Sequence, residues 1–373
     1  MGYIPIKGGK AAIEAAEELV DYFRLRGGSN PIEVKQIQDQ MRLAVDRVMG
    51  EGSLYAPFHA ALALKQAEGD TIEASFLLRA YRSTLPRIGY SLVADTREMV
   101  VIRRISAAFK DIPGGQILGP TRDYSLRLLN FCLAQEDSTY VKEFLKKFTP
   151  EVLKARTDLM EEVPSFPKVV DILRAEGLLE TPNSIEEPKK IIDITRQPLT
   201  FPAPRAARLQ AMARGETGGL MALAYSSMRG YGNIHPTLGE LRVGYVPLRI
   251  KHRTRPDEVV TVGEILVTEA EIISQMMNAD DGFPRFTLGY GLCFGHNEIK
   301  AISMAVLDRT MRSNSKETPA PAEDEEFVLY HIDGIEASGF TAHWKLPHYV
   351  TFQSVLDRLR KTQKPGIKDE NQQ

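Results

Sequence analysis

Apolar residues recur every three or four positions through much of the first half of the chain, a spacing typical of amphipathic helices. Helices are expected over residues 11–26 and 31–49. Two more are expected over residues 121–133 and 150–162, the second with Pro150 at its first position. The first half of the chain is therefore predicted to be mainly helical.

One helical hairpin carries clear boundary signals. It is expected over residues 60–84, where Gly69 would end the first helix. Asp70, with Glu73 three positions later, has the spacing of a capping box and would begin the second. Gly27-Gly28 would end the helix over residues 11–26 in the same way.

The pattern changes after residues 180–190, which are rich in proline and charge and read as a linker. Alternating or β-branched runs then indicate strands among helices. The expected elements are helices over residues 205–214 and 219–228, strands over 241–253 and 259–268, a helix over 297–312, a polar loop over 313–323 and a helix over 352–361. These patterns predict an α+β fold, with a mainly helical N-terminal half followed by a mixed strand/helix C-terminal half.

The expected organisation is a helical N-terminal domain over residues 1–180, a linker over 181–204, an α+β domain over 205–360 and a flexible tail over 361–373. A net charge of −2 argues against a dominant basic face, so no nucleic-acid partner is expected. There is no apolar run of membrane-spanning length and no secretory h-region. Two cysteines, Cys132 and Cys293, give no disulfide framework, so a reduced, cytoplasmic protein is expected.

Three of the seven histidines, His331, His343 and His348, lie close together near the C-terminus. The spacing His343-x4-His348 falls within the range seen in zinc sites, but it suits neither a helix face nor a strand face. The two imidazoles can converge only if the chain bends at Lys345-Leu346-Pro347. Further ligands would have to come from His331, Asp333, Glu336, a partner chain or the substrate. The alternative is two histidines packed at a domain surface.

Carboxylates lie close in sequence to these histidines. Cleavage of a glycosyl-type bond needs carboxylates that stabilise positive charge on the sugar and handle protons. Asp333 and Glu325 are the candidate catalytic residues. The alternative for Glu325 is an acidic loop that leads into a strand.

Phosphate binding is expected from arginines, whose planar fork suits phosphate oxygens. The candidates are Arg205, Arg208 and Arg229, together with Lys345. Surface salt bridges would give the same pattern. A second basic set alternates along the strand at residues 249–255 and is better explained as charge that protects an edge strand.

Two glycine-rich segments imitate nucleotide motifs without completing them. Gly114-x4-Gly119 has the glycine spacing of a P-loop, but Pro120 stands where the lysine should be. It is interpreted as a tight loop that leads into a helix. The glycines over residues 289–295 miss the dinucleotide spacing and are explained by close backbone packing before the helix at residue 297.

Read together, several long segments resemble the PhnI family, a core subunit of the bacterial carbon–phosphorus lyase. The resemblance covers nearly the whole chain and rests on residues 43–49 (LAVDRVM), 61–67 (ALALKQA), 110–116 (KDIPGGQ), 324–329 (DEEFVL) and 345–350 (KLPHYV), among others. The family's two zinc-binding histidines match His343 and His348.

The resemblance implies a transferase subunit that displaces the purine of ATP or GTP with a phosphonate. The product would be a ribose 1-alkylphosphonate 5-triphosphate, and the isolated protein would act as a purine nucleosidase, with water replacing the phosphonate. The resemblance further implies Zn²⁺ as cofactor, Mg²⁺ with the nucleotide, a second copy of the chain, and partner subunits of the PhnG, PhnH and PhnJ types.

Two alternatives stay open. The first is a non-catalytic scaffold subunit that donates two histidines to an interfacial zinc. The second is a stand-alone zinc hydrolase in which His331, His343 and His348 converge on one metal.

Overall fold

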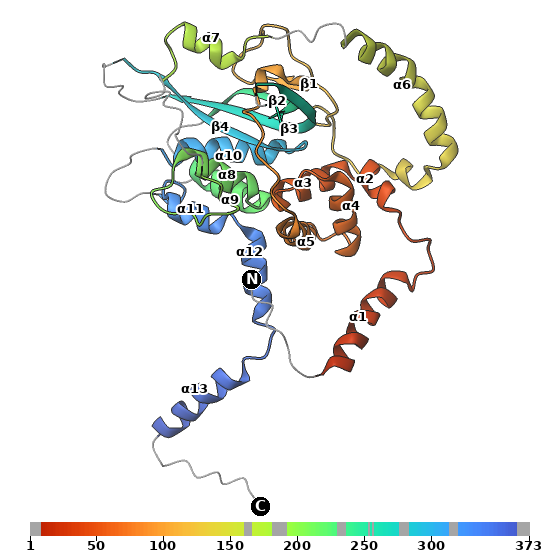
Figure 1. Ribbon diagram of the computed structural model, residues 1–373, viewed down its shortest axis with the longest axis vertical. Helices are drawn as coiled ribbons and strands as arrows, with labels where there is room; N and C mark the ends of the chain where they lie inside the picture. The colour runs from red at the N-terminus through yellow and green to blue at the C-terminus, as the bar shows by residue number, and fades with distance from the viewer. Residues whose placement is uncertain are drawn as a thin grey trace, which may run out of the picture. The chain divides into compact units, whose positions relative to one another are not determined.

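A computed structural model describes residues 9–159, 166–180, 192–229, 236–252, 254–255, 257–275, 283–312 and 320–363. The chain forms two compact units. One comprises Ile32–Ile332, and the other combines Met1–Pro31 with Asp333–Gln373. The predicted α+β class is confirmed, since helices dominate the first half of the described chain and most strands lie in the second (Figure 1).

An antiparallel sheet forms the centre of the unit Ile32–Ile332, with strand order β1-β2-β3-β4. The strands are β1 (Val100–Ile105), β2 (Thr237–Lys251), β3 (Val259–Gln275) and β4 (Phe286–Phe294). The second and third strands were predicted, although β3 is longer than expected. The sequence analysis assigned no strand to β1 or β4. Arg255 lies beyond the end of β2, so it does not belong to the basic strand face that was expected over residues 249–255. Arg253 lies outside the described residues.

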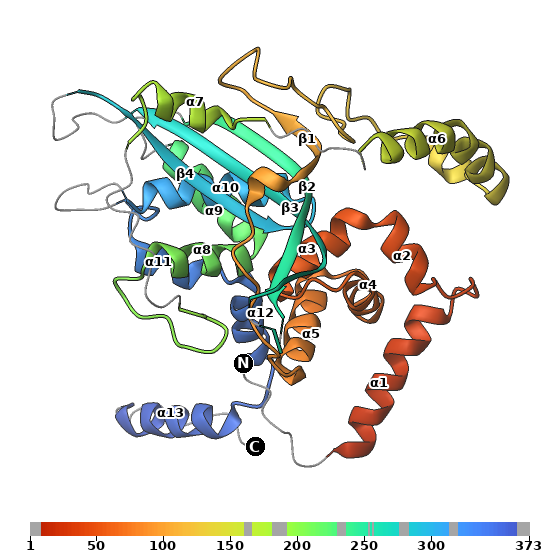
Figure 2. The same cartoon turned by 45° about the horizontal axis from the view of Figure 1, so that its top comes forward.

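One face of the sheet is apolar and packs on helices (Figure 2). These are α8 (Arg205–Arg214), α9 (Thr217–Met228) and α10 (Glu298–Thr310). Leu241, Ala270 and Cys293 from the sheet join Ala301 and Met304 of α10 in the largest apolar cluster of the described residues. Burial of this surface from water is the main stabilising force here.

Two glycines let α10 lie unusually close to β4. A Cβ atom on Gly291 would lie 2.0 Å from the backbone oxygen of Ala301, and one on Gly289 would lie 2.0 Å from that of Ala305. Only glycine permits this separation. The interpretation of this segment as close backbone packing is therefore confirmed.

The opposite face of the sheet carries buried charges, and α7 (Val169–Ala175) lies over it (Figure 1). Arg242 pairs with Glu269 from the neighbouring strand. Lys168 donates to Glu269 (2.8 Å) and Glu271 (3.2 Å), and Arg104 donates to Glu240 (2.5 Å). Opposite charges therefore compensate one another where water is excluded.

A helical subdomain precedes the sheet in the same unit. It contains α2 (Val34–Gln40), α3 (Arg42–Gly52), α4 (Pro57–Gln66) and α5 (Thr71–Thr84). The predicted hairpin is confirmed: Gly69 has a φ of 93°, and Asp70 accepts hydrogen bonds from the backbone of Ile72 and Glu73. The single helix expected over residues 31–49 is instead two helices that meet at Met41.

One predicted helix is wrong, and another begins at a different residue than expected. Residues 121–130 form turns and extended chain, followed by a short 3-10 helix, Phe131–Gln135. Leu126, Leu128 and Leu129 are at least 77% exposed, so this segment lacks the packed apolar face that stabilises most helices. The other helix, α6 (Ser138–Leu159), begins well before Pro150, which lies inside it rather than at its start.

Residues 324–331 form a helix rather than the strand considered from the sequence. Asp324 caps α11 (Glu325–His331) by accepting a hydrogen bond from the backbone of Phe327. Such capping favours a helix start and explains the outcome. Residues 313–319 of the predicted polar loop over 313–323 lie outside the described residues.

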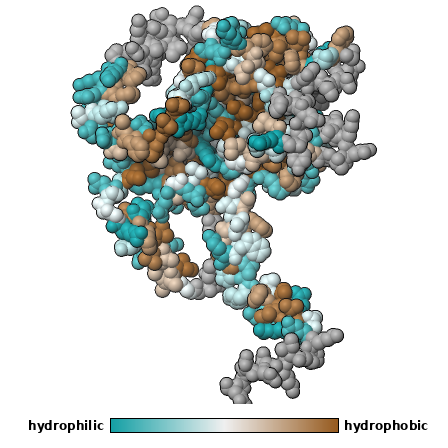
Figure 3. Space-filling view, turned by 180° about the vertical axis from the view of Figure 1, so that it is seen from behind, coloured by the Kyte–Doolittle hydropathy of each residue, from teal (hydrophilic) through white to brown (hydrophobic). Residues whose placement is uncertain are grey.

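The second unit contains α1 (Lys10–Leu25), α12 (Gly334–His343) and α13 (Tyr349–Thr362). Neither α1 nor α13 has a buried residue, and large apolar side chains such as Phe23 and Phe352 are exposed. Figure 3 shows the apolar side chains of α13 in brown near the lower end of the view. None of the helices in the described chain is long and apolar enough to cross a membrane. The predicted boundary at residues 181–204 stays a prediction, since residues 181–191 are not described.

Candidate functional site: a histidine pair and a cation-lined cavity

The chain bends between His343 and His348, as the sequence required for their side chains to meet. His343 ends α12, and α13 begins directly after His348. The two ring centroids lie 5.3 Å apart, with the ring planes at 57°. The ring of Trp344 stacks on His348 at 5.3 Å and also contacts His343. The bend therefore brings the two imidazole rings next to each other.

The hydrogen bonds of His343 and His348 determine which nitrogen of each ring carries the proton. Nδ1 of His343 is bonded to the backbone oxygen of Phe340, and Nδ1 of His348 to that of Leu346 at 2.6 Å. A carbonyl oxygen only accepts, so each Nδ1 carries the proton and donates. In the neutral rings, both Nε2 atoms therefore keep a lone pair, which is the usual arrangement of metal-binding histidines.

The pair fits zinc chemically but supplies only two ligands. Within the described residues, no group of three or more His, Cys, Asp or Glu side chains could hold a metal ion. The three-histidine site expected for a stand-alone hydrolase is therefore wrong. The binding of zinc itself stays a prediction.

The two candidate catalytic carboxylates each have structural partners. Asp333 caps α12 and accepts a hydrogen bond from the backbone of Glu336 at 3.2 Å. Glu325 accepts from the backbone of Ala203 at 2.8 Å and pairs with Arg208 at 2.8 Å. Their catalytic roles stay predictions.

The predicted phosphate-binding residues are also partnered or exposed. Arg205 forms a two-point ion pair with Asp308, whose side chain is fully buried. Arg229 donates to the hydroxyl of Tyr225 at 2.7 Å, and Lys345 is exposed. The guanidinium groups of Arg205 and Arg208 are thus committed to carboxylates.

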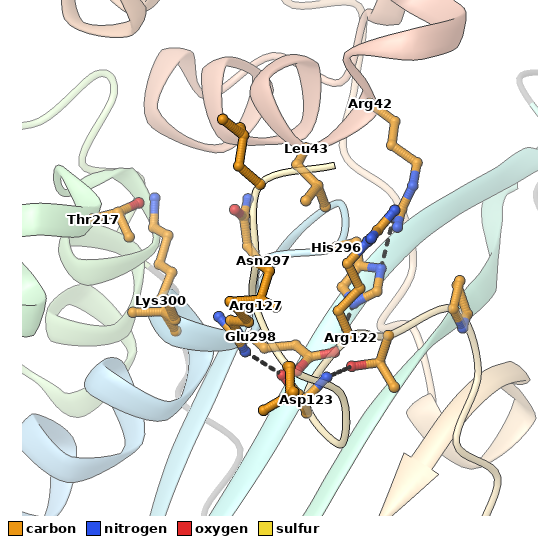
Figure 4. A pocket seen from close by; sticks show the side chains of 16 residues that line it. Arg42, Leu43, Arg122, Asp123, Arg127, Thr217, His296, Asn297, Glu298 and Lys300 are labelled. Carbon is orange, nitrogen blue, oxygen red and sulfur yellow. Dashed lines mark hydrogen bonds and ion pairs between the residues drawn. The ribbon is translucent and has the colours of Figure 1, made fainter. Parts of the chain in front are cut away.

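A cavity of about 1080 Å³ opens in the unit Ile32–Ile332, which does not contain the histidine pair. It lies where the starts of α3 and α10 meet the segment at residues 120–129, which follows the Gly114-x4-Gly119 loop (Figure 4). Four cationic side chains line it: Arg42, Arg122, Arg127 and Lys300. The size is at the upper end of the roughly 300–1,000 Å³ typical of ligand clefts.

A hydrogen-bonded series crosses one wall of this cavity. Arg42 donates to Nδ1 of His296 at 2.9 Å, and Nε2 of His296 lies 2.6 Å from Glu298 (Figure 4). Since arginine can only donate, Nδ1 of His296 accepts and its Nε2 donates to the carboxylate. The backbone of His296 is held by Asp46 at 2.9 Å. The neutral tautomer of His296 is therefore set by its two neighbours.

Lys300 projects from the first turn of α10 toward Thr217, at the start of α9 (Figure 4). Its side chain is fully buried, and its Nζ atom has no hydrogen-bond partner among the described residues. Burial lowers the pKa of this amine below its usual value. A buried, unbonded ammonium is costly, so its presence needs a reason.

The sequence analysis did not identify this cavity. The available signal was local: Gly295-His296-Asn297-Glu298 and Lys300 place several polar groups where a strand ends and a helix begins. Arg42 and Arg122 come from distant parts of the chain, and no sequence spacing connects them to Lys300.

The excess of cations in the cavity favours an anionic ligand over a cationic one. The sequence pattern of the family described as bacterial phosphonate metabolism protein (PhnI) matches residues 2–365. The chain therefore belongs to the PhnI family.

Relatives of nearly equal length support this assignment. The HtxH protein of Stutzerimonas stutzeri, named as a C-P lyase subunit, is 54% identical over 97% of this chain and 96% of its own length. Two proteins named alpha-D-ribose 1-methylphosphonate 5-triphosphate synthase subunit PhnI are each 46% identical. The Rhizobium meliloti (strain 1021) protein is matched over 94% of its length, and the Escherichia coli (strain K12) protein over 98%. The similarity extends over nearly the full length of each relative and agrees with membership of the PhnI family.

Proposed function

We propose that the chain is the nucleotide-dependent subunit of a synthase that displaces the purine of ATP or GTP with a phosphonate. The product is a ribose 1-alkylphosphonate 5-triphosphate, and the isolated chain hydrolyses the same bond as a purine nucleosidase. The observation that carries this proposal is the full-length similarity to two proteins named as subunits of a ribose 1-methylphosphonate 5-triphosphate synthase.

The reaction defines what the protein must supply. The bond between ribose C1 and the purine nitrogen breaks, its electron pair leaves with the base, and the base takes up a proton. A phosphonate oxygen, or water in the nucleosidase reaction, forms the new bond to C1. Positive charge develops on the sugar, so a carboxylate beside it and an acid near the base would lower the barrier. Asp333 and Glu325 are the proposed carboxylates.

The histidine pair is the proposed metal site. The Nε2 atoms of His343 and His348 would bind Zn²⁺, which would neutralise charge on phosphonate or phosphate oxygens. Mg²⁺ would accompany the nucleotide. The carbonyl groups of Phe340 and Leu346 hold both rings in the required tautomer.

Assembly with other subunits fits the exposed apolar surface. Helices α1 and α13 expose Leu19, Phe23, Phe352 and Leu359, each at least 53% accessible. Helix faces that expose several large apolar side chains are typical of protein interfaces. We propose partners of the PhnG, PhnH and PhnJ types and a second copy of the chain, in a cytoplasmic complex.

Incubation of the purified, zinc-loaded chain with ATP and Mg²⁺ tests the activity. Chromatography should detect free adenine and ribose 5-triphosphate, and guanine should appear with GTP. A folded, zinc-loaded chain that releases no purine would count against the nucleosidase proposal. Zinc binding and partner binding without purine release would support the non-catalytic scaffold instead.

A further inference from the structure

The cavity beside α10 carries more positive than negative charge. Its two carboxylates, Asp123 and Glu298, are already neutralised. Asp123 contacts Arg103 at 2.6 Å and Arg127 at 2.8 Å, and Glu298 contacts Arg103 at 2.8 Å. Arg103 is itself fully buried and adds a further positive charge behind the wall. The cavity therefore attracts anions and disfavours cations.

The Nζ atom of Lys300 has no hydrogen-bond partner among the described residues. Glu51 is a buried carboxylate whose charge acts on Lys300, but its oxygens accept from other groups. These are Arg47 (2.9 Å), the backbone and hydroxyl of Thr217 (3.0 and 2.8 Å) and Ser75 (3.3 Å). The buried amine of Lys300 offers up to three donors, and no described residue accepts them. An anionic ligand in the cavity would satisfy them.

The other cations lie at separate points around the same space. Arg42 is at the start of α3, whereas Arg122 and Arg127 lie on the extended segment before the 3-10 helix (Figure 4). One phosphate group would not reach all of them in a cavity of about 1080 Å³. A chain of linked phosphates, with a nucleoside attached, fits both the size and the spread of charge.

We propose that this cavity binds the polyphosphate chain of the nucleotide substrate, with Lys300 as its buried anchor and Arg42 and Arg122 as further contacts. The identity of the nucleotide rests on the proposed function, whereas the preference for a polyphosphate rests on the cavity alone. The triphosphate site is therefore assigned to α3, α10 and residues 120–127, and not to Arg205 and Arg208.

Calorimetric titration of the full chain with inorganic tripolyphosphate and with ATP tests this assignment. Lys300→Met keeps the length of the side chain and removes its charge. It should weaken both ligands by about 10- to 100-fold, the value of a charge-assisted hydrogen bond. Lys65→Met, a half-buried lysine on α4 that does not line the cavity, should leave both affinities unchanged. Methylphosphonate distinguishes a polyphosphate site from a site that binds any anion. A polyphosphate site should bind methylphosphonate far more weakly than tripolyphosphate.

A stability measurement separates binding from folding. Removal of an unbonded buried ammonium should leave the melting temperature of Lys300→Met unchanged or raised, in contrast to a lysine retained for structure. Should this variant fold poorly, Arg122→Met at an exposed position supplies the same test. Wild-type protein that does not bind tripolyphosphate, or cavity variants that bind it with unchanged affinity, would overturn the proposal.

The outcomes also distinguish this proposal from the proposed function. Binding of tripolyphosphate that depends on Lys300, without any release of purine, would retain the anion site and remove the nucleosidase. Purine release with an unchanged KM for ATP in Lys300→Met would retain the nucleosidase and remove the site.

Discussion

Arg205 and Asp308 form a two-point ion pair, with Nε to Oδ1 at 2.9 Å and Nη2 to Oδ2 at 2.7 Å. Asp308 is fully buried and also accepts from the backbone of Tyr290 at 3.0 Å. The pair fixes α8 to α10. The ion pair gives Arg205, which the sequence predicted to bind phosphate, a structural partner.

Arg205→Met should therefore destabilise the protein, because the buried carboxylate of Asp308 loses its two-point ion pair and retains the more distant Arg312 at 3.9 Å. We expect a loss of about 2–3 kcal/mol in the free energy of unfolding, at the lower end for such pairs because Arg205 is 43% exposed. Urea denaturation measures it. Arg255→Met, which breaks an exposed pair with Glu258, should cost less than about 1 kcal/mol. Equal effects of the two variants would contradict this account.

Glu271 should give the protein an unusual pH dependence. Burial and the charge of Glu269 raise its pKa from 4.5 to about 7. The folded state then binds the proton more tightly than the unfolded state between those values. Stability should therefore fall as the pH rises from about 4.5 to 7 and should not fall further above it. The opposite holds for Glu269, whose pKa is lowered to about 2, so its stabilisation is present above pH 4.5 and is lost in acid.

Glu271→Gln isolates the first effect. The variant should be more stable than the wild type at pH 8 by roughly 1–3 kcal/mol, and the difference should vanish near pH 4.5. Chemical denaturation at both pH values measures it. Glu264→Gln on the same strand is an exposed control and should not alter the pH profile. A constant difference between wild type and Glu271→Gln at all pH values would be evidence against a raised pKa.

The histidine pair predicts a defined metal content. Purified wild-type protein should contain zinc, and the double variant His343→Ala/His348→Ala should contain none by elemental analysis. His331→Ala is the matched control, because His331 also bonds a carbonyl oxygen through Nδ1 but lies outside the pair. Loss of zinc from the His331 variant, or retention in the double variant, would show that the ligands lie elsewhere.

Gly291→Ala should destabilise the fold strongly. Its new methyl group would lie 2.0 Å from the backbone oxygen of Ala301, and neither the strand nor the helix can move without disturbing the core. We expect a loss of about 3 kcal/mol, or failure to fold. Gly339→Ala in α12 has open space around the new atom and should not lower stability. Thermal unfolding monitored by circular dichroism compares the two.

Local signals in the sequence predicted the elements that depend on local interactions. The cap at Asp70, the C-terminal Gly69 and the helix over residues 205–214 needed only neighbouring residues, and the structure confirms all three. The bend between His343 and His348 followed similarly from the proline and the periodicity of regular elements.

Features set by distant contacts could not be predicted in this way. The apolar residues at 126–129 imitate a helix face, but the described residues offer no surface to bury them. Strand β4 is rich in glycine because α10 packs on it, and glycine normally weakens a strand prediction. The cavity needs Arg42 and His296 to meet although 254 residues separate them.

The two missing side chains on β4 also determine where the start of α10 lies. A methyl group at either position would lift the helix from the strands, and Lys300 in its first turn would move with it. The position of the lysine that a negatively charged ligand would meet is thus set by the strand beneath it, directly beside Ala301 and a little over one turn further along the helix.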